Sequence, residues 1–567
     1  MPDLEAQRDD QRCPDPSARN DQRSGRSAGG SAPTARSARR RFAAWALLIV
    51  LAVGARLPGI TTTSAWHDEA TSLQVARLGL YDLVVRMSLA DHQPPLIYLL
   101  IKLWAMVSWS PVWLRLLPVA LSVCGVVFAV LWLRQWDTRA GWLAGLLAAT
   151  SPMMVHYAQE LRAYALFYTA LLAGLYCGER LARRYTRRAA VGLLFCTLLM
   201  SYAHYVGLCA SIALWIYVGL RGAGWRRTAV LACAWIVLAA PMLGVGLLHT
   251  SHRTAAGFWV VPLTAQRCGE LVGSWIGLTS GRFGQHASIG LWEQAGGTTG
   301  HSWAALAMQA VVTAGVGLAL ITALATRDRP TRAAAGAMLA ASIVFFGLIA
   351  MVSWMAVPIA LGRTTFPAFI PLLGVMALSA AHGTRRALQT VGTVCCALVA
   401  GVWLFVSVSL AASDLDRRPN ERELFGAIAR RLTPADVVIV FSPEMQASAG
   451  YFLRDCATAE QILCTDFSRL EDGADGVRLK PVPRKPDPGW FERFRRAVED
   501  ARAGHADQHA VWLMDLGPRS GGDADRRRAL EWIEARYGIA EKTSVGQRWP
   551  LAARRFLPLD AANEDAD

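Results

Sequence analysis

The sequence predicts an all-α polytopic membrane protein with about eleven spans and interfacial helices in its first outer loop, followed by a small C-terminal α/β domain. Of the 567 residues, 53% are hydrophobic and only 18% are charged. The apolar residues gather in long runs, which is typical of membrane-spanning helices. Many Arg residues fall in the short loops between these runs, as the positive-inside rule expects of cytoplasmic loops.

The apolar runs define the predicted helices. The run 94–109 is short, begins with Pro94 and Pro95, and carries Lys102, whose charge is costly at the bilayer centre. We therefore predict that it lies in the interface. Counting it as a span would put every Arg-rich loop outside, so the charge pattern favours eleven spans with the N-terminal tail inside. The expected spans are 42–57, 112–133, 140–156, 162–178, 189–203, 205–220, 228–248, 303–325, 333–356, 364–381 and 387–410.

Three parts follow from this topology. Residues 1–41 are rich in Arg, Ser, Asp and Gly, cannot bury a core, and are predicted to be a disordered cytoplasmic tail. Residues 42–411 form the transmembrane domain, and 412–567 the extracytoplasmic α/β domain. The latter has expected strands at Val437–Phe441 and Ala510–Met514, and expected helices at Trp490–Ala503 and Asp523–Tyr537.

Charge and cysteine usage bear on partners and cofactors. The formal net charge of +15 suggests nucleic-acid binding, but the loop Arg residues fit the membrane topology better, so no nucleic-acid partner is expected. No Cys-x-x-Cys spacing occurs, and His505 and His509 are the one pair with His-x-x-x-His spacing. A single pair is too few ligands for a metal site. We therefore predict no metal site and assign no cofactor, while a need for a divalent metal is left open. Cys456 and Cys464 are the one cysteine pair in the expected soluble region and should form a disulfide in an oxidising compartment.

The topology brings one set of polar residues to the outer ends of the helices. They come from four or more helix junctions yet share one depth, which favours a single site there. Each also has a structural alternative: the acids as solvated loop residues, the histidines as parts of helix ends, and the arginines as surface pairs or snorkelling anchors. The candidates are Asp68, Glu69, His92, Pro94, Pro95, Tyr157, Gln159, Glu160, Arg162, Tyr164, His204, Tyr205 and Arg363, with the loop 249–302 beside them.

Together these residues resemble the membrane glycosyltransferases of family 39, in the larger GT-C class. That family includes protein O-mannosyltransferases, lipid A aminoarabinose transferases and bacterial relatives. The resemblance covers roughly residues 42–455. It rests on Asp68-Glu69 after the first span, His92-x-Pro94-Pro95-Leu96, the run Tyr157-x-Gln159-Glu160-x-Arg162-x-Tyr164, His204-Tyr205, and Asp436-Val-Val opening the external domain. One departure is Gln93, since some aminoarabinose-type relatives have Lys in that position.

The resemblance implies a GT-C fold and a polyprenyl-phosphate sugar donor. It implies an acceptor (a glycan, lipid or protein) on the outer face of the plasma or inner membrane. Asp68 would be the base, Glu69 would orient that acid or the sugar, and Arg162 or Arg363 would neutralise the lipid phosphate. His92 and Tyr157 would be polar wall residues.

Three other classes stay open. A polymerase or ligase of surface polysaccharide also uses lipid-linked sugars, and the loop 249–302 partly fits such an enzyme. A transporter or flippase should show charged or broken helices at mid-membrane, often in repeated halves. A membrane scaffold would only display the C-terminal domain. The spans are mostly uncharged, with no internal repeat, and the polar groups gather at one face, which favours the transferase.

Overall fold

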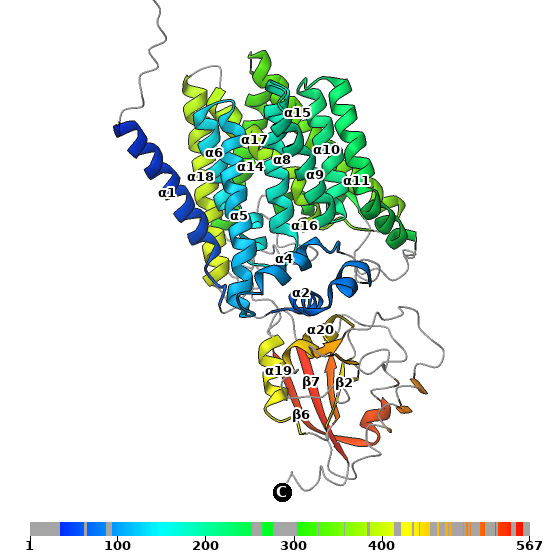
Figure 1. The fold of residues 1–567 in the computed structure, drawn as a ribbon. Coiled ribbons are helices and arrows are strands. Elements are labelled where there is room, and N and C mark those ends of the chain that lie inside the picture. Colours follow the sequence, from blue (N-terminus) through cyan, green and yellow to red (C-terminus); the bar gives the residue numbers. More distant parts are fainter. Residues whose placement is uncertain are drawn as a thin grey trace, which may run out of the picture. The chain divides into compact units, whose positions relative to one another are not determined.

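The computed structural model (Figure 1) describes residues 35–61, 65–86, 93–251, 263–275, 303–326, 328–356, 358–382 and 386–412, and shorter stretches between 421 and 558. Residues 1–49 form one unit and residues 50–567 another. Helix α1, Ala35–Arg56, runs across this boundary. The predicted division at residues 41 and 411 stays a prediction.

A bundle of long apolar helices follows α1 (Figure 1). Every predicted span coincides with helical residues, but two are divided. The span 140–156 has a break at Ser151, and the span 364–381 falls into Gly362–Thr365, the 3₁₀ turn Phe366–Ala368 and Phe369–His382. By length and composition, five helices of the described residues could cross a membrane. The chain is thus a multi-pass membrane protein, and the full count of eleven spans stays a prediction. The bundle helices are α5 (Pro111–Arg134), α6 (Thr138–Thr150), α8 (Tyr164–Arg183), α9 (Arg187–Ala203), α10 (Val206–Leu220), α11 (Trp225–Ser251), α14 (Trp303–Ala325), α15 (Arg329–Met355), α17 (Phe369–His382) and α18 (Arg386–Ala412).

The break after α6 comes from Pro152, which begins the short helix α7, Pro152–Tyr157. Proline has no N–H to donate to the carbonyl four residues earlier, that of Ala148. The buried guanidinium of Arg56 supplies the missing donors, with Nη2 3.1 Å from the Ala148 oxygen and Nη1 2.9 Å from the Ala149 oxygen. The kink is therefore stabilised by a buried cation, and it redirects the chain toward Tyr157.

Short helices lie at one end of the bundle (Figure 1). They are α2 (His67–Arg77), the π-helical turn η2 (Asp82–Arg86), α4 (Leu96–Trp104), α12 (Ala265–Trp275), α16 (Gly362–Thr365) and the 3₁₀ turn η4 (Phe366–Ala368).

Helix α4 lies within the run that the charge pattern excluded as a span. Its nine residues reach about 14 Å at 1.5 Å per residue, far short of a hydrocarbon core of about 30 Å. Lys102 Nζ donates to the Ala76 oxygen at 3.2 Å and to the Leu78 oxygen at 2.9 Å, at the C-terminal end of α2. The charge that argued against a span therefore caps a neighbouring helix.

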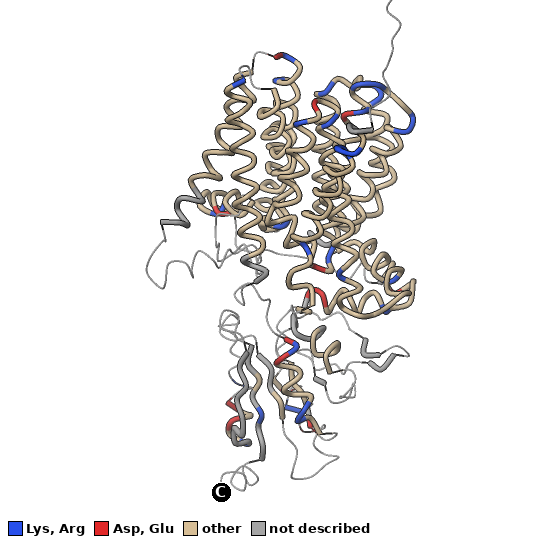
Figure 2. The backbone as a smooth tube through the Cα atoms, turned by 90° about the vertical axis from the view of Figure 1, so that its left-hand side faces the viewer, with Lys and Arg blue, Asp and Glu red and all other residues tan. Residues whose placement is uncertain are grey.

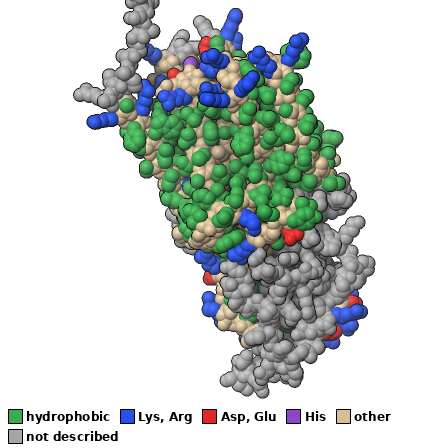
Figure 3. All heavy atoms as spheres, in the orientation of Figure 1, with side chains coloured by type: hydrophobic (Ala, Val, Ile, Leu, Met, Phe, Trp, Pro, Cys, Tyr) green, Lys and Arg blue, Asp and Glu red, His purple; other side chains and the backbone are tan. Residues whose placement is uncertain are grey.

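Lys and Arg gather at the opposite end of the bundle (Figure 2). Hydrophobic side chains cover the flank between the two ends (Figure 3). At the basic end α5 finishes with Arg134, α9 starts with Arg187 and α18 starts with Arg386. This distribution supports a topology with the basic loops inside, and the orientation stays a prediction.

The described parts of the C-terminal segment contain a mixed sheet with the strand order β2-β1-β5-β7-β6. Strand β1 runs parallel to β2 and β5, while β7 runs antiparallel to β5 and β6. The predicted strands correspond to β1 and β5. The predicted helix 523–537 ends too late, because Tyr537 already pairs with Pro558 in β6 and β7. The elements are α19 (Glu421–Ala429), β1 (Val437–Val440), α20 (Pro443–Phe452), β2 (Ile462–Leu463), β3 (Glu471–Gly473), β4 (Gly476–Arg478), β5 (Val511–Asp515), β6 (Tyr537–Val545) and β7 (Leu551–Pro558).

Candidate active site

The side chains of Asp68, Arg162 and Arg363 are distant in sequence but lie together in the structure. Asp68 lies in the first turn of α2, where the helix dipole favours a carboxylate. Arg363 of α16 places Nη1 3.4 Å from its Oδ2, and Arg162, just before α8, places Nη2 3.7 Å from its Oδ1. The Asp68 side chain keeps 21% of its surface exposed. The site thus combines one accessible carboxylate with two guanidinium groups.

The neighbouring acid, Glu69, faces a different environment. Its side chain is 1% exposed and forms a two-pronged ion pair with Arg115 of α5: Nη2 to Oε2 at 2.7 Å and Nε to Oε1 at 3.3 Å. The Leu161 N–H donates to the same Oε1 at 2.9 Å. Glu69 therefore joins α2 to α5 and to the turn before α8. The sequence did not single out Arg115, because an Arg near a helix start is also an ordinary interfacial anchor.

Arg162 lies in a polar network beneath Asp68. Its Nη1 is 3.4 Å from each of three oxygens: the Asp68 carbonyl, Ser72 Oγ and the Tyr98 hydroxyl. The Tyr98 hydroxyl in turn donates to Gln93 Oε1 at 3.3 Å. Gln93 occupies the position at which some aminoarabinose-type relatives have Lys. Its side chain is a buried member of this network.

The two prolines fix the start of α4. Pro95 is its N-cap residue, and both Pro94 and Pro95 are buried. His92 lies outside the described residues, so its predicted role stays a prediction.

The Tyr164 ring lies against the guanidinium of Arg363, and Tyr157 and Tyr168 pack beside Tyr164. The Tyr164 ring centroid is 5.6 Å from its guanidinium carbon, within range of a cation–π interaction. The Tyr157 ring packs on Tyr164 at 4.8 Å, and the Tyr168 hydroxyl donates to the Arg363 carbonyl at 2.9 Å. Tyr168 was not among the predicted residues, yet its spacing of four from Tyr164 places both on one face of α8.

Three further candidates have mainly positioning contacts. Gln159 Nε2 donates to the carbonyls of Arg56 at 3.0 Å and Pro58 at 2.7 Å, which ties the end of α1 to the site. Glu160 is fully buried and close enough to Arg363 to interact electrostatically. Tyr205, the N-cap residue of α10, is half-buried.

His204 occupies the turn between α9 and α10, outside both helices. Its ring centroid is 5.6 Å from that of Tyr164 and 6.1 Å from that of Phe167. Burial, together with the positive charges of Arg363 and Arg162, lowers the pKa of His204 to about 3. The imidazole is therefore neutral at physiological pH.

Part of the predicted loop 249–302 also approaches the site. Within it, α12 is described, and Trp275 Nε1 donates to Thr365 Oγ1 of α16 at 3.0 Å. Among the described residues, no group of three His, Cys, Asp or Glu side chains could hold a metal ion.

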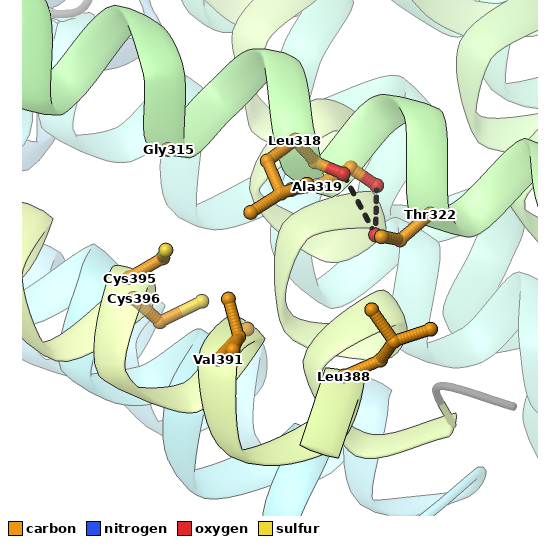
Figure 4. Close-up of a pocket in the computed structure, with 9 residues that line it drawn as sticks. Gly315, Leu318, Ala319, Thr322, Leu388, Val391, Cys395 and Cys396 are labelled. Atoms are coloured by element: carbon orange, nitrogen blue, oxygen red, sulfur yellow. Dashed lines mark hydrogen bonds between the residues drawn. The ribbon is translucent and has the colours of Figure 1, made fainter. Parts of the chain in front are cut away.

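A separate pocket lies between α14 and α18 (Figure 4). Its lining is almost wholly apolar, and the Thr322 hydroxyl is already donated to the Leu318 and Ala319 carbonyls of its own helix. Thr322 lies near the C-terminal end of α14, and Leu388 lies near the start of α18, which begins with Arg386. This pocket is not part of the polar site.

No protein-family profile and no curated protein sequence matches the chain. Among solved structures, the chain is similar to ArnT from Cupriavidus metallidurans in the apo state, with a TM-score of 0.53 and 14% identity over 92% of this chain and 98% of that one. ArnT from the same organism bound to undecaprenyl phosphate gives a TM-score of 0.50, 14% identity and the same coverage. An oligosaccharyltransferase from Archaeoglobus fulgidus gives 0.45 at 12% identity, over 92% of this chain and 75% of that one, which is too low to support an inference. The expected fold type is thus confirmed: the chain has a polytopic membrane fold of the GT-C type, while the span count and the C-terminal domain stay predictions.

Proposed function

We propose that the chain is an integral-membrane glycosyltransferase that moves a sugar from a polyprenyl-phosphate-linked donor to an extracytoplasmic acceptor. The observation that carries this proposal is the meeting of Asp68 with Arg162 and Arg363 at one end of a GT-C bundle. The carboxylate offers a base, and the guanidinium groups offer two binding sites for a phosphate. Their position at a bundle end suits a substrate whose lipid lies in the bilayer.

In the proposed reaction, an acceptor hydroxyl attacks the anomeric carbon while Asp68 accepts its proton. A carbon–oxygen bond forms to the acceptor, and the bond from the anomeric carbon to the phosphate oxygen breaks. Polyprenyl phosphate leaves with that electron pair, and the arginines stabilise its charge. Since phosphate is a tolerable leaving group, the reaction depends more on a base than on a general acid.

The distances around Asp68 suit this exchange of partners. At 3.4 and 3.7 Å, both ion pairs are at the long end of the range for such contacts. A donor phosphate would offer the guanidinium groups a second anion, and their hold on Asp68 would weaken as they turned toward it. Glu69 cannot exchange in this way, because its 2.7 Å pair with Arg115 is buried. We therefore propose Asp68 as the base and Glu69 as a residue that positions it.

The lipid partner is proposed from the same chemistry. The similar ArnT structure is bound to undecaprenyl phosphate, which supports a polyprenyl phosphate as the lipid bound by this chain. The acceptor class is a glycan, a lipid or a protein. The basic loops at the far end of the bundle support a site on the outer face of the plasma or inner membrane.

A deletion strain tests the function as a whole. We expect the lipid fraction to accumulate a sugar-linked polyprenyl phosphate, and an envelope glycan, lipid or protein to lose one sugar, both detected by mass spectrometry. Wild-type protein supplied in trans should reverse both changes, and the Asp68→Asn variant should reverse neither. An unchanged lipid and glycan profile, together with no transfer by the purified protein, would refute the proposal.

A further inference from the structure

The turn between α9 and α10 holds the His204 ring in one orientation. The His204 N–H donates to the Met200 oxygen at 3.1 Å, and the Gly207 N–H donates to the His204 oxygen at 2.7 Å. The two chain segments approach so closely that a Cβ at position 207 would lie 2.0 Å from the Met200 oxygen. Only glycine fits there, so residue 207 fixes the turn that carries His204.

The same turn determines which ring nitrogen carries the proton. The Val206 N–H, at the start of α10, donates to His204 Nδ1 at 3.1 Å. A nitrogen that accepts a hydrogen bond is unprotonated, and the neutral ring must then carry its proton on Nε2. The low pKa of the group keeps the ring in this neutral form at physiological pH.

Nε2–H is available to a ligand. His204 is half-buried, and Nε2 has no hydrogen-bond partner within the described part of the chain. It is not one of the fully buried side-chain atoms without a partner in that part of the chain, so it keeps some accessible surface. The ring and the Arg363 guanidinium both lie 5.6 Å from the Tyr164 ring, and the charges of Arg363 and Arg162 act on His204. Two guanidinium groups favour an anionic oxygen as the ligand here.

We propose that His204 is a phosphate-binding residue, whose Nε2–H donates a hydrogen bond to an oxygen of the lipid phosphate held by Arg162 and Arg363. This inference rests on the proposed function and adds to it a neutral donor beside two charged ones. A neutral imidazole can bind the phosphate without adding positive charge near Asp68. Its role is therefore binding, and it does not carry the proton released by the acceptor.

Two substitutions separate this role from simple capping of α10. In His204→Asn, the amide oxygen replaces Nδ1 and can still accept from the Val206 N–H, but no polar atom remains at the position of Nε2. In His204→Gln, the longer side chain brings an amide N–H to about the position of Nε2 and gives up the cap. Tyr202→Phe is the matched control. It removes a hydroxyl that lies at the same end of α9 and donates to the Leu238 oxygen.

The probe is undecaprenyl phosphate, and the readout is its affinity for the full-length protein in detergent, measured beside the thermal unfolding midpoint. A hydrogen bond to a charged oxygen corresponds to roughly a 10- to 100-fold change in affinity. We expect His204→Asn to lose that much, His204→Gln to lose less than about threefold, and Tyr202→Phe to bind as wild type does. The Asn variant should nevertheless unfold at the same temperature as the Gln variant or higher, because it retains the cap.

Each other outcome counts against the inference. Equal affinities of the Asn and Gln variants, at any level, would overturn it, and so would an affinity that follows the unfolding temperature, with Asn binding better than Gln. In either case His204 is only a cap, and the proposed glycosyltransferase stands. If the wild-type protein does not bind undecaprenyl phosphate at all, the polyprenyl-phosphate donor itself is refuted, and the inference with it.

Discussion

Replacing the two adjacent acids one at a time should separate catalysis from stability. For Asp68→Asn we expect turnover to fall roughly 10²–10⁴-fold, since the amide cannot accept the proton; this equals about 2.7–5.5 kcal/mol in the activation barrier. Stability should fall less than in Glu69→Gln. The Asp68 carboxylate is 21% exposed and its ion pairs, with arginines that are 11% and 12% exposed, are 3.4 and 3.7 Å long. Longer and less buried pairs lose less free energy when one partner becomes neutral.

Glu69→Gln should have the opposite effect. The pair with Arg115 is buried on both sides, with side-chain exposures of 1% and 4%. Removing one partner leaves the other charge buried and uncompensated, which costs about 3–5 kcal/mol. The Gln oxygen can still accept from the Leu161 N–H, so the loss comes from the ion pair. The Glu69→Gln protein that remains folded should keep its turnover within about tenfold of wild type. Loss of a true base would lower turnover at least about 10²-fold, so the two cases can be distinguished.

The assay is transfer from a polyprenyl-phosphate sugar in liposomes, with turnover normalised to folded protein and unfolding followed by tryptophan fluorescence. Asp137→Asn is the control for an acid-to-amide change. Asp137 caps α6 at the basic end of the bundle by accepting from the Arg139 and Ala140 N–H groups, and Asn caps equally well. Normal turnover of Asp68→Asn would refute the base assignment. A Glu69→Gln variant that is as stable as wild type but inactive would reverse the roles of the two acids.

Three further predictions concern the phosphate, the disulfide and the topology. Arg363→Ala should weaken donor use more than Arg363→Lys, because Lys keeps the charge and loses only the fork of donors; full activity in both variants would make Arg363 an anchor alone. Cys456 and Cys464, which lie outside the described residues, should react with a thiol reagent only after reduction, and equal labelling before and after would exclude their disulfide. A reporter fused after Leu410 should report the outer side of the membrane and one within Arg180–Arg188 the inner side; the reverse result would move the site to the other face.

Much of the fold could be predicted from the sequence, because long apolar runs and basic loops are local signals. They defined most bundle helices to within a few residues and brought the site residues to one end. The breaks at Pro152 and at Phe366–Ala368 were not predicted. Pro alone does not show whether a membrane helix bends or ends, since the outcome depends on a donor for the freed carbonyl. At Pro152 that donor is Arg56, more than 90 residues away in the sequence.

The roles of the two acids could not be separated by sequence, for a geometric reason. Neighbouring residues on a helix point about 100° apart, so one of two adjacent acids can face the protein while the other faces open space. Which one is buried depends on where its partner lies. Arg115, at a separation of 46 residues, pairs with Glu69. Nothing in the local sequence around Asp68 and Glu69 encodes that choice.

Lys102 links the topology of the chain to its proposed chemistry. As a charge within an apolar run, it was one of the reasons to exclude 94–109 as a span, beside the short length of the run, its two prolines and the Arg-rich loops. In the structure its ammonium group donates to the Ala76 and Leu78 carbonyls at the end of α2. The first turn of that same helix carries Asp68 and Glu69. A membrane-spanning α4 would carry Lys102 away from α2 and leave those carbonyls without a cation. The lysine that argues against a membrane-spanning α4 therefore also holds in place the helix that bears the proposed base.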